Sequence, residues 1–153
     1  MFSLSRLNTA EVTFENSYVS NSAGLHKYVD PKDNQTYIYS HLEPFNCHRW
    51  FPCFDQPSVR APLTITLAVP SKDWTVVSNA NAERVVNLLD AKAEPFRSTF
   101  EIPIQGLPEE EDCRIHFFKP TPPISTYIYG LFAGPFYTYL NDNGPVPMRI
   151  LAS

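Results

Sequence analysis

Fifteen of the 153 residues are prolines, and they constrain the fold of this chain more than any other feature. Proline fixes φ and removes a backbone donor, so it ends helices and avoids the interior of sheets. Between the prolines, short segments alternate apolar with polar or β-branched residues, which is the pattern of strands. These segments are 36–42, 63–69, 96–102, 114–118 and 124–139. The sequence therefore predicts an all-β fold of twisted antiparallel sheets.

Only the segment 80–91 has a composition that also suits a helix. It contains the adjacent β-branched residues Val85 and Val86, followed by Asn87, and these residue types disfavour helix. We therefore expect an irregular hairpin there. With 43% hydrophobic and 14% aromatic residues, the chain is large and apolar enough for one core-bearing domain.

Charge and cysteine content restrict the partners and the compartment. The formal net charge is −4 and no basic run occurs, which argues against nucleic acid and anionic membranes as partners. Neither a signal peptide nor a membrane-spanning apolar run is visible in the sequence. The three cysteines are odd in number and form no Cys-x-x-Cys motif, which favours a reducing compartment. We expect a cytoplasmic protein.

The segment 43–57 contains chargeable residues among aromatic residues and three prolines. This composition predicts a rigid connecting loop rather than a helix or strand. The simplest interpretation is structural. Trp50, Phe51 and Phe54 would plug one end of the core.

A metal site is a further interpretation of the same region. His41, Cys47, His48 and Cys53 carry the ligand types of zinc, but their spacings match no structural zinc pattern. The sequence therefore predicts no metal site in this chain.

The run Glu-Pro-Phe-Asn-Cys-His-Arg-Trp-Phe-Pro-Cys-Phe-Asp-Gln-Pro at 43–57 is similar to a family signature. It resembles the N-terminal domain of zinc aminopeptidases of the aminopeptidase N type (the gluzincins), in which a Phe-Glu-Pro-like start leads to Ala-Arg and Phe-Pro-Cys-Phe-Asp-Glu/Gln-Pro. Four more stretches agree in the same order, at 24–39, 60–62, 74–79 and 124–136. The resemblance covers roughly 24–151 and only the later half of the family's domain.

This resemblance implies part of a saddle-like β domain at 24–151. Residues 1–23 would then be an N-terminal extension, and the alternating segment Glu11–Phe14 a replacement strand. Arg49 and Asp55 match the family motif, and we interpret them as a structural, buried pair that locks the loop.

The motifs that carry the family's chemistry are absent from this sequence. Zinc hydrolysis there uses His-Glu-x-x-His on a helix, and the substrate's amino end is covered by a Gly-x-Met-Glu-Asn loop. No two of the four histidines are four residues apart, and neither motif occurs. We expect no catalytic residues here, zinc only in a separate catalytic domain, and no peptide hydrolysis by this chain alone.

The resemblance does assign two substrate-binding positions. Glu43 occupies the place of the family's glutamate that receives the substrate's α-ammonium group, and His41 occupies the place of a residue that lines the pocket for the first side chain. Residues i and i+2 of a strand share a face, so we expect both side chains to point the same way.

Two functions remain open from the sequence. The chain is either the substrate-anchoring N-terminal part of a zinc aminopeptidase, or a non-catalytic structural or interaction subunit that keeps the same fold. In both cases a partial sheet presents an unpaired edge, so we expect the catalytic domain or another protein chain to cover it. A carbohydrate-binding module is a weaker alternative, because no carboxylate pair accompanies the aromatic residues.

Overall fold

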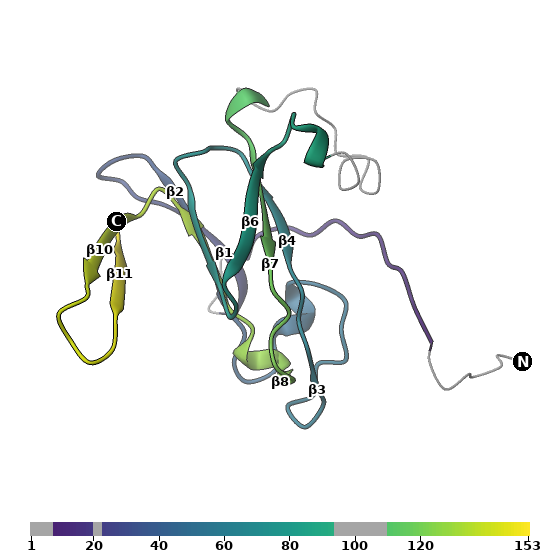
Figure 1. Cartoon of the computed structure of the whole chain (residues 1–153). Helices are drawn as coiled ribbons and strands as arrows, with labels where there is room; N and C mark the ends of the chain where they lie inside the picture. The colour runs from purple at the N-terminus through teal and green to yellow at the C-terminus, as the bar shows by residue number, and fades with distance from the viewer. Residues whose placement is uncertain (1–7, 20–22, 94–109) are drawn as a thin grey trace, which may run out of the picture.

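The computed structural model describes residues 8–19, 23–93 and 110–153 (Figure 1). These residues form strands and short 3₁₀ turns without an α-helix, which confirms the predicted all-β class. The strands are β1 (Gly24–Val29), β2 (Thr36–His41), β3 (Arg60–Ala61), β4 (Thr66–Val69), β5 (Thr75–Ser78), β6 (Ala82–Asn87), β7 (Arg114–Phe118), β8 (Ile124–Ser125), β9 (Leu131–Gly134), β10 (Tyr137–Asn141) and β11 (Met148–Ala152). The 3₁₀ turns are η1 (Cys47–Arg49), η2 (Ala91–Ala93), η3 (Glu110–Asp112) and η4 (Thr126–Ile128). No helix that could span a lipid bilayer occurs within the described ranges.

Two antiparallel sheets form the main body. One has the strand order β1-β2-β9-β5 and the other the order β4-β7-β6. The core lies between them, because both sheets contribute to one buried cluster of Ile38, Val69, Val76, Phe118, Leu131 and Ala133. Apolar side chains on the inner face of each sheet pack against the facing sheet to form this cluster.

Two smaller clusters extend this core. Leu88, Ala93, Cys113 and Ile115 pack beneath β6 and β7. Leu42, Cys47 and Tyr129 are buried at the end of β2, with Trp50, Phe51 and Cys53 packed against them. The second of these clusters anchors the 43–57 loop to the strands that position it.

Two predicted strands differ from the observed ones. The segment 63–69 becomes strand only from Thr66, because the backbone N–H of Leu63 donates to the Thr121 hydroxyl oxygen at 2.9 Å instead of joining the regular ladder. The segment 124–139 is interrupted by η4 and by a corner at Pro135, so it yields β8, β9 and β10.

The expected hairpin at 80–91 is wrong as well. This segment contains the single strand β6, which pairs with β7, followed by a turn into η2. The segments 36–42 and 114–118 form strands β2 and β7, as predicted. The predicted strand 96–102 lies outside the described residues.

Within its described residues 8–19, the N-terminal segment does not supply the predicted replacement strand. Glu11–Phe14 is not part of any strand and is exposed, and Figure 1 shows this stretch running away from the sheets. The contact with β1 comes later, where Val19 forms an isolated parallel bridge with His26. This single bridge pairs few of the backbone N–H and C=O groups along the edge of β1.

Gly134 provides a direct test of the corner between β9 and β10. A Cβ at this position would lie 2.7 Å from Tyr37 Cδ1 and 3.2 Å from the carbonyl oxygen of Thr36. Tyr37 is 4% exposed and packs on Phe136, with ring centroids 5.0 Å apart, so its ring has little room to move. We expect Gly134→Ala to lower the free energy of unfolding by about 1–3 kcal/mol.

Urea denaturation measures this change. The matched control is Gly144→Ala, whose Cβ would meet no atom closer than 3.6 Å. Equal midpoints for the two variants would contradict the tight corner.

Candidate functional site

The end of β2 presents the two predicted substrate-binding residues to solvent. His41 and Glu43 are both exposed, and Leu42 between them is 2% exposed and anchors the strand end in the core. A turn follows at once. Asn46 closes it, because its backbone N–H donates to the Leu42 carbonyl at 2.8 Å and its side-chain amide donates to the Glu43 carbonyl at 2.7 Å. This local network fixes the backbone on which the Glu43 carboxylate is carried.

Asp55 holds the loop closed from its other end. Its Oδ2 accepts the backbone N–H of His48 at 3.1 Å and lies 2.8 Å from His48 Nδ1. Its Oδ1 accepts the hydroxyl of Thr126 at 2.7 Å, which connects the loop to η4 across 71 positions of sequence. The Asp55 side chain is 7% exposed, so these contacts replace most of its hydration.

These contacts also determine the charge of Asp55. Burial by itself raises the pKa of the carboxyl group, but the hydrogen bonds from Thr126 and His48 and the positive charge of protonated His48 favour the ionised form. The net result is a pKa below the ordinary aspartate value. Asp55 is therefore a carboxylate at neutral pH, and it acts as an acceptor for three groups.

Arg49 does not occupy the predicted place. It is exposed, so it is not a member of a buried pair with Asp55, and its backbone carbonyl accepts the side-chain amide of Asn16 at 2.6 Å. His48, which precedes it in η1, takes the contact with Asp55 through both its backbone and its ring. The ring of His48 is itself 53% exposed.

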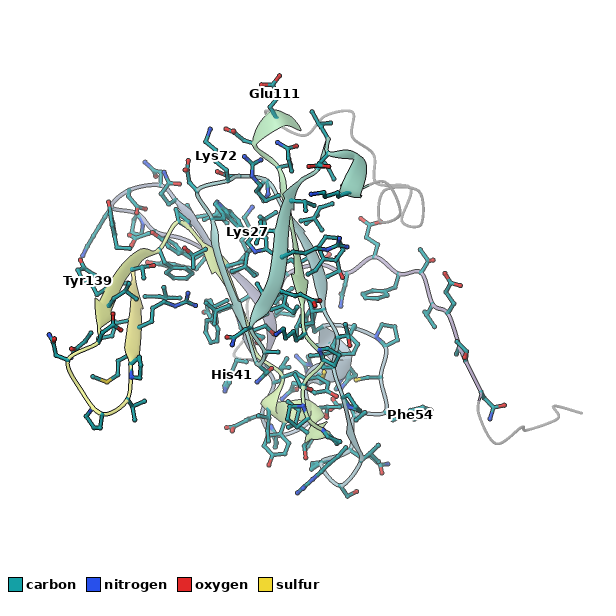
Figure 2. All side chains as sticks on the ribbon, in the orientation of Figure 1. Lys27, His41, Phe54, Lys72, Glu111 and Tyr139 are labelled. Atoms are coloured by element: carbon teal, nitrogen blue, oxygen red, sulfur yellow. The ribbon has the colours of Figure 1, made fainter. Side chains whose placement is uncertain are left out.

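The aromatic residues of the loop divide into two groups. Trp50 and Phe51 pack edge to face with ring centroids 5.2 Å apart, and Phe51 also stacks on Tyr129. The Tyr129 hydroxyl donates to the Ala61 carbonyl at 3.1 Å, so these rings connect η1 with β3. Phe54 is the exception to the predicted plug, because it is 86% exposed and points away from the fold in Figure 2.

The described residues do not offer a zinc site. No group of three His, Cys, Asp or Glu side chains within them is arranged to hold a metal ion. Zinc in proteins takes three or four such ligands, so these residues do not fit it. Glu43 and His41 are the exposed chargeable side chains at the end of β2.

Sequence reasoning missed two residues that matter for the geometry, His48 and Thr126. Thr126 lies in the Ile-Ser-Thr-Tyr stretch that resembles the family, so a signal existed, but nothing in the spacing indicated that its hydroxyl reaches Asp55. The neighbouring Ser125 donates to the Pro57 carbonyl at 2.7 Å. Two consecutive hydroxyls thus bind both ends of the motif Asp-Gln-Pro.

Comparisons with known proteins place the chain among relatives of one family. Residues 4–104, more than half of the chain, match the family described as the Peptidase M1 N-terminal domain. The chain is 31% identical to aminopeptidase N of Streptomyces lividans over 147 residues, which cover 94% of this chain and 14% of that protein. It is 27% identical to aminopeptidase Ey of Gallus gallus, covering 90% of this chain and 12% of that protein. It is 26% identical to human aminopeptidase N, covering 91% of this chain and 13% of that protein.

The chain therefore spans only about an eighth of the length of these relatives. All three carry the name aminopeptidase, and the family model matches the N-terminal domain alone. The chain belongs to the Peptidase M1 N-terminal domain family.

Proposed function

We propose that this chain is the substrate-anchoring N-terminal β domain of a zinc aminopeptidase that removes N-terminal residues from peptides. The observation that carries the proposal is the placement of Glu43, an exposed carboxylate on a backbone fixed by Leu42 and Asn46. A carboxylate carried on a fixed backbone suits the free ammonium group at a peptide's amino end, because the pair forms a charge-assisted hydrogen bond. Holding that group would place the first peptide bond at the catalytic centre.

His41 would line the pocket for the first side chain of the peptide. It lies two residues before Glu43 and is exposed like it. An imidazole is shorter and more readily protonated than a glutamine amide, so this residue would alter which first side chains the enzyme prefers.

The reaction itself would take place in a catalytic domain outside this chain, which would also carry the zinc. That domain would be the principal partner, and it would cover a surface that is exposed in the described residues. The hairpin β10–β11 is the best candidate for this contact, because it stands apart from both sheets (Figure 1). One of its faces is apolar and exposed, and is formed by Tyr137, Tyr139, Met148 and Ile150. A two-stranded hairpin is marginal in water on its own, so a covering surface would stabilise it.

A second candidate function is that of a non-catalytic structural or interaction subunit. The exposed hairpin face suits assembly with another protein equally well. For both candidates we propose the cytoplasm as the compartment.

Native and denatured mass of the protein from its own source distinguish the two candidates. The first predicts a polypeptide much heavier than 17.4 kDa that contains zinc. A 17.4 kDa chain inside a larger, metal-free complex would favour the second. A lone 17.4 kDa monomer that binds no other protein would contradict both.

A further inference from the structure

A cleft of about 380 Å³ lies beside the start of β2. It is lined by the β1–β2 turn, the β4–β5 turn and the β9–β10 corner. These connections contribute two carboxylates, an amide, a hydroxyl and two aromatic rings, from Asp33, Asp73, Gln35, Ser71, Trp74 and Tyr137. The 43–57 loop follows the other end of β2, roughly 17 Å away along the strand. The cleft is therefore separate from the candidate functional site.

The carboxylate of Asp33 is held in place by its own turn. Its Oδ1 accepts the backbone N–H of Gln35 at 2.8 Å, and its Oδ2 accepts the hydroxyl of Tyr37 at 3.1 Å. An ionised carboxylate has about four lone-pair sites, so each oxygen can accept one further hydrogen bond. Asp33 can therefore bind a ligand without breaking the contacts that position it.

Asp73 brings the second carboxylate from the β4–β5 turn. Its backbone N–H donates to Ser71 Oγ at 3.1 Å, and the N–H of Trp74 donates to the Ser71 carbonyl at 3.3 Å. No hydrogen bond to the Asp73 carboxylate occurs among the described residues. Lys72 acts on it through its charge, but Lys72 Nζ donates to Asp112 at 2.7 Å. The Asp73 carboxylate is thus available to a ligand.

Two aromatic rings complete the lining of the cleft. Trp74 is half-buried and packs against the main core cluster, which fixes its indole. Tyr137 begins β10 and is 68% exposed. The residues that line the cleft include neither lysine nor arginine. The charges of two carboxylates and the faces of two aromatic rings both attract a cation.

We propose that this cleft binds the guanidinium group of an arginine side chain from another polypeptide. A guanidinium has five N–H donors and no acceptor, which matches two carboxylates, and its flat face stacks on aromatic rings. A lysine ammonium is more strongly hydrated and cannot stack, so it suits the indole less well. The proposal does not depend on substrate anchoring by Glu43, and it holds for either candidate function.

The position of the cleft makes this group accessible to a partner. Figure 2 shows Lys72, which precedes Asp73 in sequence, near the top of the view and His41 well below it. A polypeptide whose arginine occupies the cleft would therefore approach the molecule away from the end of β2. Its binding would leave Glu43 and His41 uncovered.

Nuclear magnetic resonance of the ¹⁵N-labelled 153-residue protein tests the site. The probe is a tripeptide with a central arginine and both ends capped, and its match contains citrulline, a neutral side chain of nearly the same shape. We expect the arginine peptide to shift the Trp74 indole N–H and the Asp73 amide resonances to saturation. The citrulline peptide should leave them in place. A lysine peptide should bind at least about tenfold more weakly.

Two variants locate the charge that is responsible. Asp73→Asn should weaken binding of the arginine peptide at least about tenfold, because it removes a charge-assisted hydrogen bond. The matched control is Asp142→Asn, which makes the same change of net charge at an exposed position beyond the other end of β10. Its dissociation constant should equal that of the wild type.

Several results would overturn the proposal. One is the absence of a saturable shift with the arginine peptide in the wild-type protein. Another is equal shifts with the arginine and citrulline peptides, because the charge would then play no part. Equal weakening by Asp73→Asn and Asp142→Asn would show a general effect of net charge. Saturable shifts at Trp74 with glucose in place of the peptides would indicate a carbohydrate site instead.

Discussion

Replacing Glu43 with alanine, in an aminopeptidase that carries this domain, is expected to raise KM for peptide substrates by roughly 10- to 150-fold, because a hydrogen bond to a charged group contributes about 1.5–3 kcal/mol. The variant removes the carboxylate that would receive the substrate's ammonium group. Steady-state kinetics measure KM, and a metal assay measures the bound zinc. Bound zinc should be unchanged, since Glu43 belongs to no metal-holding group among the described residues.

The matched control for that experiment is Glu83→Ala. Glu83 is likewise an exposed carboxylate, but it lies on β6 in the other sheet. Its removal should leave KM unchanged. An unaltered KM in the Glu43 variant would remove the anchoring role.

Replacing Asp55 with alanine should produce the largest loss of stability at the loop. The variant removes the acceptor for the His48 backbone, the His48 ring and the Thr126 hydroxyl. Hydrogen bonds to a charged acceptor are individually strong and Thr126 is 6% exposed, so we expect a decrease of about 2–4 kcal/mol in the free energy of unfolding. Urea denaturation measures it.

Two companion variants separate the contributions to this loss. His48→Ala removes only a half-exposed ring and should cost less than about 1 kcal/mol. Asp55→Asn keeps an acceptor for Thr126, but its amide nitrogen is itself a donor and would face the donors of His48. The loss of unfolding free energy in this variant should therefore lie between those of Asp55→Ala and His48→Ala. Identical midpoints for Asp55→Ala and His48→Ala would contradict the role given to the carboxylate.

The same carboxylate makes stability depend on pH in acid. The folded pKa of Asp55 is depressed, so its contribution is complete above the unfolded value of about 3.9 and is lost as pH falls through the folded pKa. The difference between wild type and Asp55→Ala should therefore shrink below that value. A difference that stays constant into strong acid would show that ionisation of Asp55 plays no part.

The sequence predicted best those strands that pair with a neighbouring strand on each side. The segments 36–42 and 114–118 each form a ladder with neighbours on both sides. The segment 124–139 has equal β propensity, but η4 interrupts it where Thr126 bonds to Asp55. A contact between residues 71 positions apart is not visible in local periodicity.

The sequence motif was enough to locate the candidate site, but it did not indicate which side chains contact one another there. The family resemblance singled out the segment 43–57, and the structure places it as a closed loop at the end of β2. The choice of His48 over Arg49 as the Asp55 partner depends on the path of η1, in which the backbone N–H and ring of one residue face the same carboxylate. The roles of Glu43 and His41 in substrate binding stay predictions.

The central claim is that Glu43 binds the amino end of the peptide, and the coupling free energy between Glu43 and the ligand's ammonium group tests it most directly. It is obtained from dissociation constants of four complexes: wild type and Glu43→Gln, each with a peptide inhibitor and with its des-amino analogue. Our account predicts that removing the amino group weakens binding strongly in wild type and little in the variant, with a coupling of about 1.5–3 kcal/mol. Equal losses in both proteins, which mean zero coupling, would show that Glu43 does not bind the peptide's amino end.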